Sequence, residues 1–298
     1  MTAPTAHPFG VTSMHRNLRR VAMRRPGAIL TADHRRWHYG KPIDADALAT
    51  QYQAFVDLLI GDGCEVVWLD DDQTPPDDDL ADSVFTYDPS FVVGEGAIVL
   101  RPGKELRVGE AALHRRFYHR LGIPILGEIE APGMVEGGDL FWIDDTTLAA
   151  GRGFRTNQHG IDQLADILTP LGVQLFVLDL PYFHGPDACL HLLSVISPLD
   201  ADLALIHAPM VPTALYQRLV DDGYQLLPAP PAEFEASSGL NLNVLATGPR
   251  RCIAVEGFPG TLELLRSAGC DVRTFAADEL CIPCEGGPTC LTRPLLRA

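Results

Sequence analysis

The sequence contains no apolar run that approaches the roughly 18 residues of a helix that crosses a membrane. Basic residues are also few, because 23 lysines and arginines stand against 39 aspartates and glutamates, a formal net charge of −16. A chain this acidic repels nucleic acid and anionic lipid and attracts cationic small molecules. We therefore expect a cationic small molecule as partner, and neither nucleic acid nor a membrane.

Cysteine is sparse as well, with seven residues scattered along the chain, an odd number that argues against a disulfide framework. The stretch MTAPTAHPFG lacks the basic flank and apolar segment of a secretion signal. A reducing, cytoplasmic location is therefore expected. Cys281 and Cys284 have the spacing of half a zinc site, but no second pair matches them, so we expect no metal.

The remaining composition is that of an ordinary globular protein, with 46% hydrophobic and 21% charged residues. This excludes a disordered chain. Glycine and proline, 27 and 24 residues, are more frequent than average and indicate many turns between short elements. No linker or change of composition divides the 298 residues, so residues 1–298 are expected to form a single domain.

One pattern recurs five times: an amphipathic stretch ends at a glycine, and an apolar strand follows almost at once. The glycines, which we call the hinge glycines, are Gly63, Gly122, Gly172, Gly223 and Gly269. Glycine after a helix adopts the left-handed cap at little steric cost. Short β-like runs precede the amphipathic stretches, three of which span 44–60, 109–121 and 160–171. Five strand–helix–strand units of about 50 residues favour an α/β ring over an open doubly wound sheet.

Residues that suit catalysis follow four of the hinge glycines at similar distances: Asp82 and Asp88 after Gly63, Glu136 after Gly122, His191 after Gly172, and Cys290 after Gly269. If the units close around an axis, these residues converge at its mouth. Asp82 then begins a strand at SVF, after an acidic run at 70–82 that is typical of a solvated loop.

Each candidate also has an ordinary structural explanation. A free cysteine such as Cys290 is commonly a small buried core residue. His191 lies in the apolar stretch ACLHLLSVIS, which is typical of a strand with a hydrogen-bonded core histidine. Glu136 lies beside glycines and suits a turn. The residues alone leave both interpretations open.

Several motifs, in the same order along the chain, resemble the guanidine-modifying enzymes, and within them the dimethylarginine dimethylaminohydrolase family. They are DSVFTYD at 82–88, RPGKELRVGE at 101–110, MVEGGDLFWI at 134–143, GRGFRTNQHG at 151–160, CLHLLS at 189–194 and GGPTCLT at 286–292. The resemblance covers nearly the whole chain. It implies a five-bladed α/β propeller, the pentein fold, in agreement with the five repeats.

The resemblance also implies roles for particular residues. Cys290 would be the nucleophile, His191 the general acid and base, and Glu136 the acidic partner of the histidine. Asp88 would hold the substrate guanidinium. The residues that would engage the amino-acid end of the substrate are Asp82, Arg107 and Arg155. Two arginines in so acidic a chain suit a carboxylate, which a guanidinium binds through two hydrogen bonds.

The chemistry of this residue set follows from the substrate. A guanidinium is a poor electrophile, so carboxylates must hold it while a thiolate attacks its carbon. His191 would then protonate the departing amine, leaving a thiouronium on Cys290, and activate water to hydrolyse it. The product would be a ureido compound, and no metal or organic cofactor is required.

Two departures from the family pattern bear on the substrate. His191-Leu192-Leu193 lacks the aspartate that arginine deiminases and amidinotransferases place two residues after the histidine, which favours N-methylated arginine as substrate and citrulline plus a methylamine as products. Tyr87-Asp88 replaces the usual Glu-Asp, which leaves open an arginine deiminase or dihydrolase acting on free arginine. Ribosome anti-association factors, which are non-catalytic and five-bladed, are the alternative class. A homo-oligomer is left open.

Overall fold

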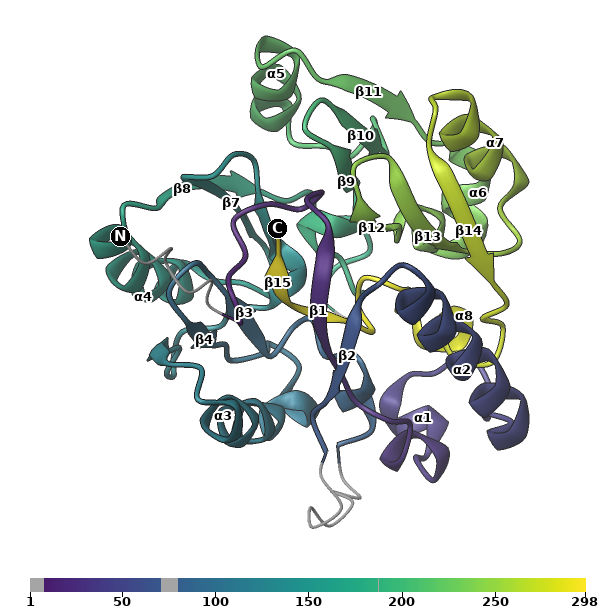
Figure 1. Cartoon of the computed structure of the whole chain (residues 1–298), viewed down its shortest axis with the longest axis horizontal. Coiled ribbons are helices and arrows are strands. Elements are labelled where there is room, and N and C mark those ends of the chain that lie inside the picture. The colour runs from purple at the N-terminus through teal and green to yellow at the C-terminus, as the bar shows by residue number, and fades with distance from the viewer. Residues whose placement is uncertain (1–7, 71–79, 187) are drawn as a thin grey trace, which may run out of the picture.

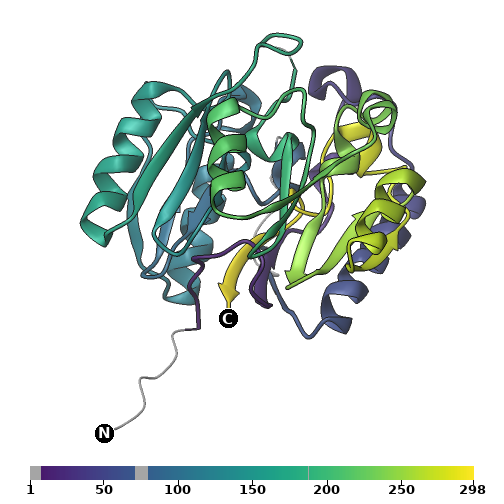
Figure 2. The same cartoon turned by 90° about the horizontal axis from the view of Figure 1, so that it is seen from above.

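Five small sheets surround a central axis in the computed structural model, which describes residues 8–70, 80–186 and 188–298 (Figure 1). Each sheet has three strands, and the longer helices lie on the outside of the ring (Figures 1 and 2). The five sheets are separate in the described residues, with no continuous ladder of backbone hydrogen bonds joining one to the next. Most of the acidic run at 70–82 lies outside the described residues.

Four of the sheets are formed by consecutive segments. In the first of them β3 (Ser90–Val92) pairs antiparallel with β4 (Ala97–Val99), α3 (Glu110–Leu121) crosses the sheet, and β5 (Ile125–Glu128) returns parallel to β4. The other three repeat this order: β6 (Leu140–Trp142), β7 (Thr147–Arg152), α4 (Gln158–Leu168) and β8 (Gln174–Asp179); β9 (Ile196–Asp200), β10 (Leu203–Ile206), α5 (Thr213–Asp221) and β11 (Gln225–Pro228); β12 (Leu245–Gly248), β13 (Arg251–Val255), α7 (Pro259–Ser267) and β14 (Asp271–Phe275).

The remaining sheet joins the two ends of the chain. It contains β1 (Leu18–Met23), β2 (Glu65–Trp68) after α2 (Ala45–Gly61), and the last strand β15 (Arg293–Arg297). β15 pairs antiparallel with β1, and β1 pairs parallel with β2. The C-terminal strand therefore takes the place that β3, β6, β9 and β12 hold in the other sheets. These five strands are the inner strands, and each contributes residues to the central pocket described below.

The hinge glycines have the conformation that their sequence position predicts. Their φ angles lie between +66° and +84°, the left-handed region that side chains rarely adopt, and each comes between an outer helix and a parallel strand. An added Cβ would meet nothing within 4 Å, so backbone conformation rather than crowding requires glycine. The expected repeat of strand, helix, glycine and strand is therefore confirmed.

The amphipathic helices bury the faces that their periodicity indicates. In α2, Leu48, Tyr52, Phe55 and Leu59 recur at helical spacing and are buried, and the Phe55 ring stacks on Phe275 of β14 at a centroid distance of 4.8 Å. The Asp44 side chain caps this helix by accepting hydrogen bonds from two of its first backbone N–H groups. None of the helices in the described ranges has the length and apolar character needed to span a bilayer.

Two segments expected to be strands form turns instead. Asp82 lies in a 3₁₀ helix, Ala81–Val84, and His191 immediately precedes another, Leu192–Ser194. The backbone N–H of His191 donates to the Ser194 hydroxyl at 3.0 Å, which closes the second turn. Both segments are apolar because they are buried next to the axis, and burial alone does not distinguish a strand from a turn. The remaining short helices are α1 (His34–Trp37), α6 (Pro231–Ser237) and α8 (Cys281–Cys284).

Candidate active site

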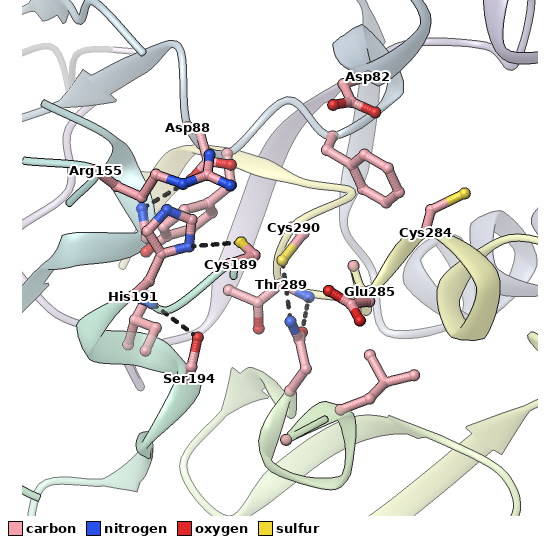
Figure 3. Close-up of a pocket in the computed structure, with 18 of the residues that line it drawn as sticks. Asp82, Asp88, Arg155, Cys189, His191, Ser194, Cys284, Glu285, Thr289 and Cys290 are labelled. Carbon is pink, nitrogen blue, oxygen red and sulfur yellow. Dashed lines mark hydrogen bonds between the residues drawn. The ribbon is translucent and has the colours of Figure 1, made fainter. Parts of the chain in front are cut away.

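A pocket of about 550 Å³ opens where the five units meet. In each unit, the segment just before the inner strand carries one polar side chain of the site, and Figure 3 shows three of them, Asp88, His191 and Cys290. These residues, one per unit, are Asp88 before β3, Glu136 before β6, His191 before β9, Asn243 before β12 and Cys290 before β15. The predicted convergence is therefore what the structure shows. Asn243 was missed in the sequence, although it follows the hinge glycine Gly223 by 20 residues, as His191 and Cys290 follow theirs by 19 and 21.

His191 and Glu136 form a buried pair. His191 Nε2 lies 2.5 Å from Glu136 Oε2, and the Glu136 side chain is fully buried. Burial by itself would lower the pKa of His191, but the neighbouring Cys189, Asp88 and Glu136 outweigh it and raise that pKa well above its usual value. Burial would raise the pKa of Glu136, yet Arg155 and His191 hold it well below its usual value. The pair is therefore an imidazolium beside a carboxylate.

Cys290 is held by Asn243, which belongs to the unit after Gly223, where the sequence predicted no site residue. Asn243 Nδ2 donates to Cys290 Sγ at 3.0 Å, and Asn243 Oδ1 accepts from the backbone N–H of Thr289 at 2.9 Å (Figure 3). A Cβ at Gly287 would lie 2.6 Å from the Asn243 side chain, so the Gly-Gly-Pro turn must keep glycine there. Burial and the Asp88 charge raise the pKa of the Cys290 thiol to about 11, against the opposing effects of Asn243 and His191. With this pKa, the candidate nucleophile is a protonated thiol at neutral pH.

Asp88 lies close to His191, and hydrogen bonds to both of its carboxylate oxygens hold the side chain in place. Asp88 Oδ1 accepts from the backbone N–H of Gly138 at 2.9 Å, and Oδ2 accepts from Arg107 Nη1 at 2.7 Å. A Cβ at Gly138 would lie 2.6 Å from His191 Nδ1 and 3.1 Å from Asp88 Oδ1. The glycines of MVEGGDLFWI therefore permit the carboxylate and the imidazole to approach one another.

Arg107 is buried, and all three of its guanidinium nitrogens have partners. Besides Asp88, they donate to the Glu110 carboxylate and to the Phe85 carbonyl at 2.9–3.2 Å. Burial raises the pKa of Glu110 to about 7, against the opposing charge of Arg107. The family resemblance implies a place for Arg107 at the amino-acid end of the substrate. In this structure it instead supports Asp88, and it would have to leave these partners to reach a substrate carboxylate.

The other two residues expected at the amino-acid end are also engaged. Arg155 Nη1 donates to both Glu136 oxygens, at 3.2 and 3.3 Å. Asp82 accepts from the Tyr39 hydroxyl at 2.6 Å and from Lys104 Nζ at 2.6 Å. Nothing in the sequence indicates a role for Lys104, because its contact with Asp82 joins two segments that are 22 residues apart and depends on how they pack. Six of the seven predicted residues line the pocket, and Glu136 lies behind His191.

A second thiol lies beside the histidine. Cys189 Sγ is 3.8 Å from His191 Nδ1 and lines the same pocket (Figure 3). The one group of residues in the described chain that could offer three metal ligands consists of Asp88, Glu136 and His191, with ligand atoms within 4.8 Å of one another. Arg107 and Arg155 already supply positive charge to the two carboxylates. The arrangement therefore suits a planar cationic substrate held by a carboxylate opposite a thiol, with an acid–base pair beside it.

Comparisons with known proteins give a consistent result. A family model described as arginine deiminase matches residues 77–226. A dimethylarginine dimethylaminohydrolase of Streptomyces coelicolor is 31% identical over 248 residues, which cover 81% of this chain and 86% of the relative. One from Pseudomonas aeruginosa is 29% identical over 255 residues, covering 86% and 91%.

Solved structures extend the likeness to the fold. A mutant of the Pseudomonas aeruginosa enzyme complexed with citrulline aligns with a TM-score of 0.73 at 24% identity, covering 93% of this chain and 99% of that one. An amidinotransferase from Microseira wollei aligns with a TM-score of 0.76 at 17% identity, covering 97% of each chain. The expected pentein architecture is confirmed by these matches and by the five sheets.

Proposed function

We propose, because this chain belongs to the family of dimethylarginine dimethylaminohydrolases and arginine deiminases, that it hydrolyses N-methylated arginine to citrulline and a methylamine. The observation that carries the proposal is the convergence of Cys290, the His191–Glu136 pair and Asp88 on one pocket. A non-catalytic binding protein has no use for this set. The net charge of −16 supports a cationic substrate rather than nucleic acid. We also propose one domain, since β15 pairs with β1.

Asp88 would orient the guanidinium. Its carboxylate is rigid because Gly138 N–H and Arg107 each hold one oxygen, and a carboxylate oxygen can accept a further hydrogen bond. Fixing the guanidinium opposite Cys290 converts a bimolecular attack into an intramolecular one. Arg107 is thus a positioning residue for Asp88 in this proposal.

Substrate binding would activate the nucleophile. The Cys290 thiol, with its pKa raised to about 11, is almost entirely protonated at pH 7. A bound guanidinium adds positive charge next to the sulfur, and together with the imidazolium of His191 it favours the thiolate. The thiol proton leaves to solvent or to a transiently neutral His191, and the sulfur attacks the guanidinium carbon.

His191 would then serve both halves of the reaction. Its proton passes to the departing methylamine as the C–N bond breaks, leaving a thiouronium on Cys290. The neutral imidazole next takes a proton from water, which adds to the same carbon and displaces the thiolate, so that citrulline forms. Glu136 keeps the ring oriented and stabilises its charged form through the Nε2 contact of 2.5 Å.

The preference for a methylated substrate rests on Leu193. Leu193 lines the pocket two positions after His191. In arginine deiminases and amidinotransferases a carboxylate at this position would bind a second guanidinium nitrogen. An apolar side chain there leaves that nitrogen without a charged partner and tolerates methyl groups. Tyr87, which replaces a carboxylate, is only 3% exposed, and the Arg293 guanidinium lies over its ring. Its position therefore supports neither substrate over the other.

A direct comparison of substrates tests the proposal. We expect kcat/KM for asymmetric dimethylarginine and monomethylarginine to exceed that for arginine by at least about tenfold, the scale on which one methyl-sized contact discriminates. Citrulline, ornithine and released amines should be quantified separately. A clear preference for arginine would assign the chain to deiminase activity, and ornithine as the main product to dihydrolase activity. Absence of turnover on all three would refute the proposed function.

Lys104 is expected to weaken binding of an amino-acid substrate. We propose that the Asp82 carboxylate binds the ammonium group of the substrate. Lys104 Nζ already forms an ion pair with Asp82 Oδ2 at 2.6 Å and would compete for it. Lys104→Met should remove this competitor and lower KM by up to about fivefold, the range of a partly exposed ion pair, with kcat little changed. Lys41→Met is the matched control, since the chain's other lysine pairs with Glu279 at the surface. A rise in KM would instead mean that Lys104 contacts the substrate.

A further inference from the structure

A lysine ammonium lies in the pocket, against the carboxylate that we propose for a substrate ammonium. Lys104 Nζ donates to Asp82 Oδ2 at 2.6 Å and to the Trp37 carbonyl at 3.2 Å. It also lies 5.0 Å from the centroid of the Trp37 ring. A carboxylate, a carbonyl and an aromatic face are the groups that bind an ammonium ion. Within the chain, Lys104 therefore makes the contacts that the α-ammonium group of a substrate would make.

The other oxygen of Asp82 has a partner as well. The Tyr39 hydroxyl donates to Asp82 Oδ1 at 2.6 Å. Burial and the Asp82 charge raise the pKa of the Tyr39 phenol, so the hydroxyl stays protonated and remains a donor at neutral pH. Asp82 is 6% exposed, and the Lys104 side chain is 21% exposed, so most of the ion pair is shielded from solvent. A substrate ammonium must displace Lys104 or lie beside it as a like charge, whereas a substrate without an ammonium leaves the pair intact.

Other carboxylates of the described residues do not take the place of Asp82. Glu105 and Glu285 also line the pocket, but both are exposed. An exposed carboxylate in contact with water binds a cation weakly. Asp88 is paired with Arg107 and is the residue proposed to bind the guanidinium. In the part of the chain that the structure describes, the pocket therefore offers no buried and unpaired carboxylate for a second positive charge on the substrate.

Arg155, in contrast, can still bind a substrate carboxylate. Its Nη1 donates to both oxygens of Glu136, and its other two guanidinium nitrogens have no hydrogen-bond partner among the described residues. Glu136 also pairs with the imidazolium of His191, so one carboxylate faces two cations. A guanidinium binds a carboxylate well through two of its N–H groups. The site is thus able to bind the negative end of a guanidino acid.

The segments that carry Lys104 and Arg155 are packed against one another. The backbone N–H of Gly103 donates to Glu136 Oε1 at 2.8 Å, and Glu136 is the partner of Arg155. A Cβ at Gly103 would lie 3.1 Å from the Arg155 carbonyl oxygen, so glycine permits this close approach. Lys104 therefore belongs to the part of the pocket where the carboxylate end of a substrate would bind.

We propose, resting on the C–N hydrolysis proposed above, that this site also takes N-methylated guanidino acids that lack the α-ammonium group. The desamino analogue of asymmetric dimethylarginine represents this class. Its guanidinium binds Asp88 and its carboxylate binds Arg155, while the ion pair of Lys104 stays in place. Water adds to the guanidinium carbon, the bond from this carbon to the dimethylated nitrogen breaks, and dimethylamine leaves with a proton from His191. The other product is a ureido acid without an amino group.

A comparison of two substrates on the wild type tests the proposal. The values of kcat/KM for asymmetric dimethylarginine and for its desamino analogue are measured from the dimethylamine released. We expect the desamino analogue to have the higher value, by about three- to fivefold, the upper range for a partly exposed ion pair. A lower kcat/KM for the desamino analogue, with turnover of dimethylarginine, would overturn this proposal and leave the hydrolase activity standing. Turnover of neither compound would refute both.

Lys104→Met identifies the residue responsible for the preference. Because Asp82 then lacks its cation, kcat/KM for dimethylarginine should rise relative to that for the desamino analogue, and the wild-type preference should disappear. A purely structural effect of the substitution would change both values by the same factor. Lys41→Met, which removes the surface pair with Glu279, should keep the wild-type ratio. An unchanged ratio in Lys104→Met would show that Lys104 does not determine the substrate.

Discussion

Cys290→Ser is expected to reduce the release of amine from methylated arginine by on the order of 10⁴-fold or more. A serine hydroxyl at this position would accept the Asn243 hydrogen bond, yet it does not ionise near neutral pH and cannot form the thiouronium. The fold should persist, because the substitution changes one atom in a partly buried turn. Steady-state turnover and circular dichroism of the purified variant measure the two effects.

The matched control is Cys284→Ser, since Cys284 also lines the pocket but has no role in the proposed chemistry. It should retain wild-type turnover. The wild-type thiol provides a second readout: with its pKa raised to about 11, alkylation of Cys290 by iodoacetamide should quicken about tenfold per pH unit between pH 7 and 10. Near-wild-type turnover of Cys290→Ser would show that another group attacks the substrate.

His191→Ala should lower kcat by roughly 10²–10⁴-fold, because the same imidazole donates a proton to the leaving amine and takes one from water. Of the two steps, hydrolysis has no substitute base at hand, since the pKa of Glu136 is held well below its usual value and Asp88 is paired with Arg107. The intermediate should therefore accumulate. Mass spectrometry of the quenched variant during turnover should detect a thiouronium on Cys290.

His119→Ala serves as the control, because His119 is exposed on α3 and far from the proposed chemistry. It should match the wild type in kcat and carry no adduct beyond the wild-type level. If His191→Ala turns over slowly and its Cys290 stays unmodified throughout, covalent catalysis is contradicted. If kcat is unchanged, the acid–base assignment is wrong and Cys189, the other group at His191 Nδ1, becomes the next residue to test.

Local features of the sequence predicted the architecture well. The hinge glycines mark a backbone conformation that one residue type adopts at low cost, so Gly63, Gly122 and their three equivalents could be identified without knowledge of any contact. The helical periodicity of α2 likewise depends only on neighbours along the chain. The same regularity marks Asn243, because it follows Gly223 at nearly the distance at which His191 and Cys290 follow their own hinge glycines. The apolar runs around His191 and Asp82 predict strands where the structure has turns, because an apolar run indicates burial and not the hydrogen-bonding pattern.

What the sequence by itself determined, therefore, is the repeat, the approximate position of one site residue per unit, and, through family resemblance, the identity of the reacting groups. Only the tertiary structure decided which charge pairs with which. Arg107 donates to Asp88, Lys104 donates to Asp82, and the guanidinium of Arg293 lies over the ring of Tyr87. Each of these contacts joins segments that are separate in the sequence, and its strength depends on distances and burial created when the five units pack together. The spacing of residues along the chain predicts their backbone conformation and the face that they bury. It does not predict which partner neutralises a charged side chain.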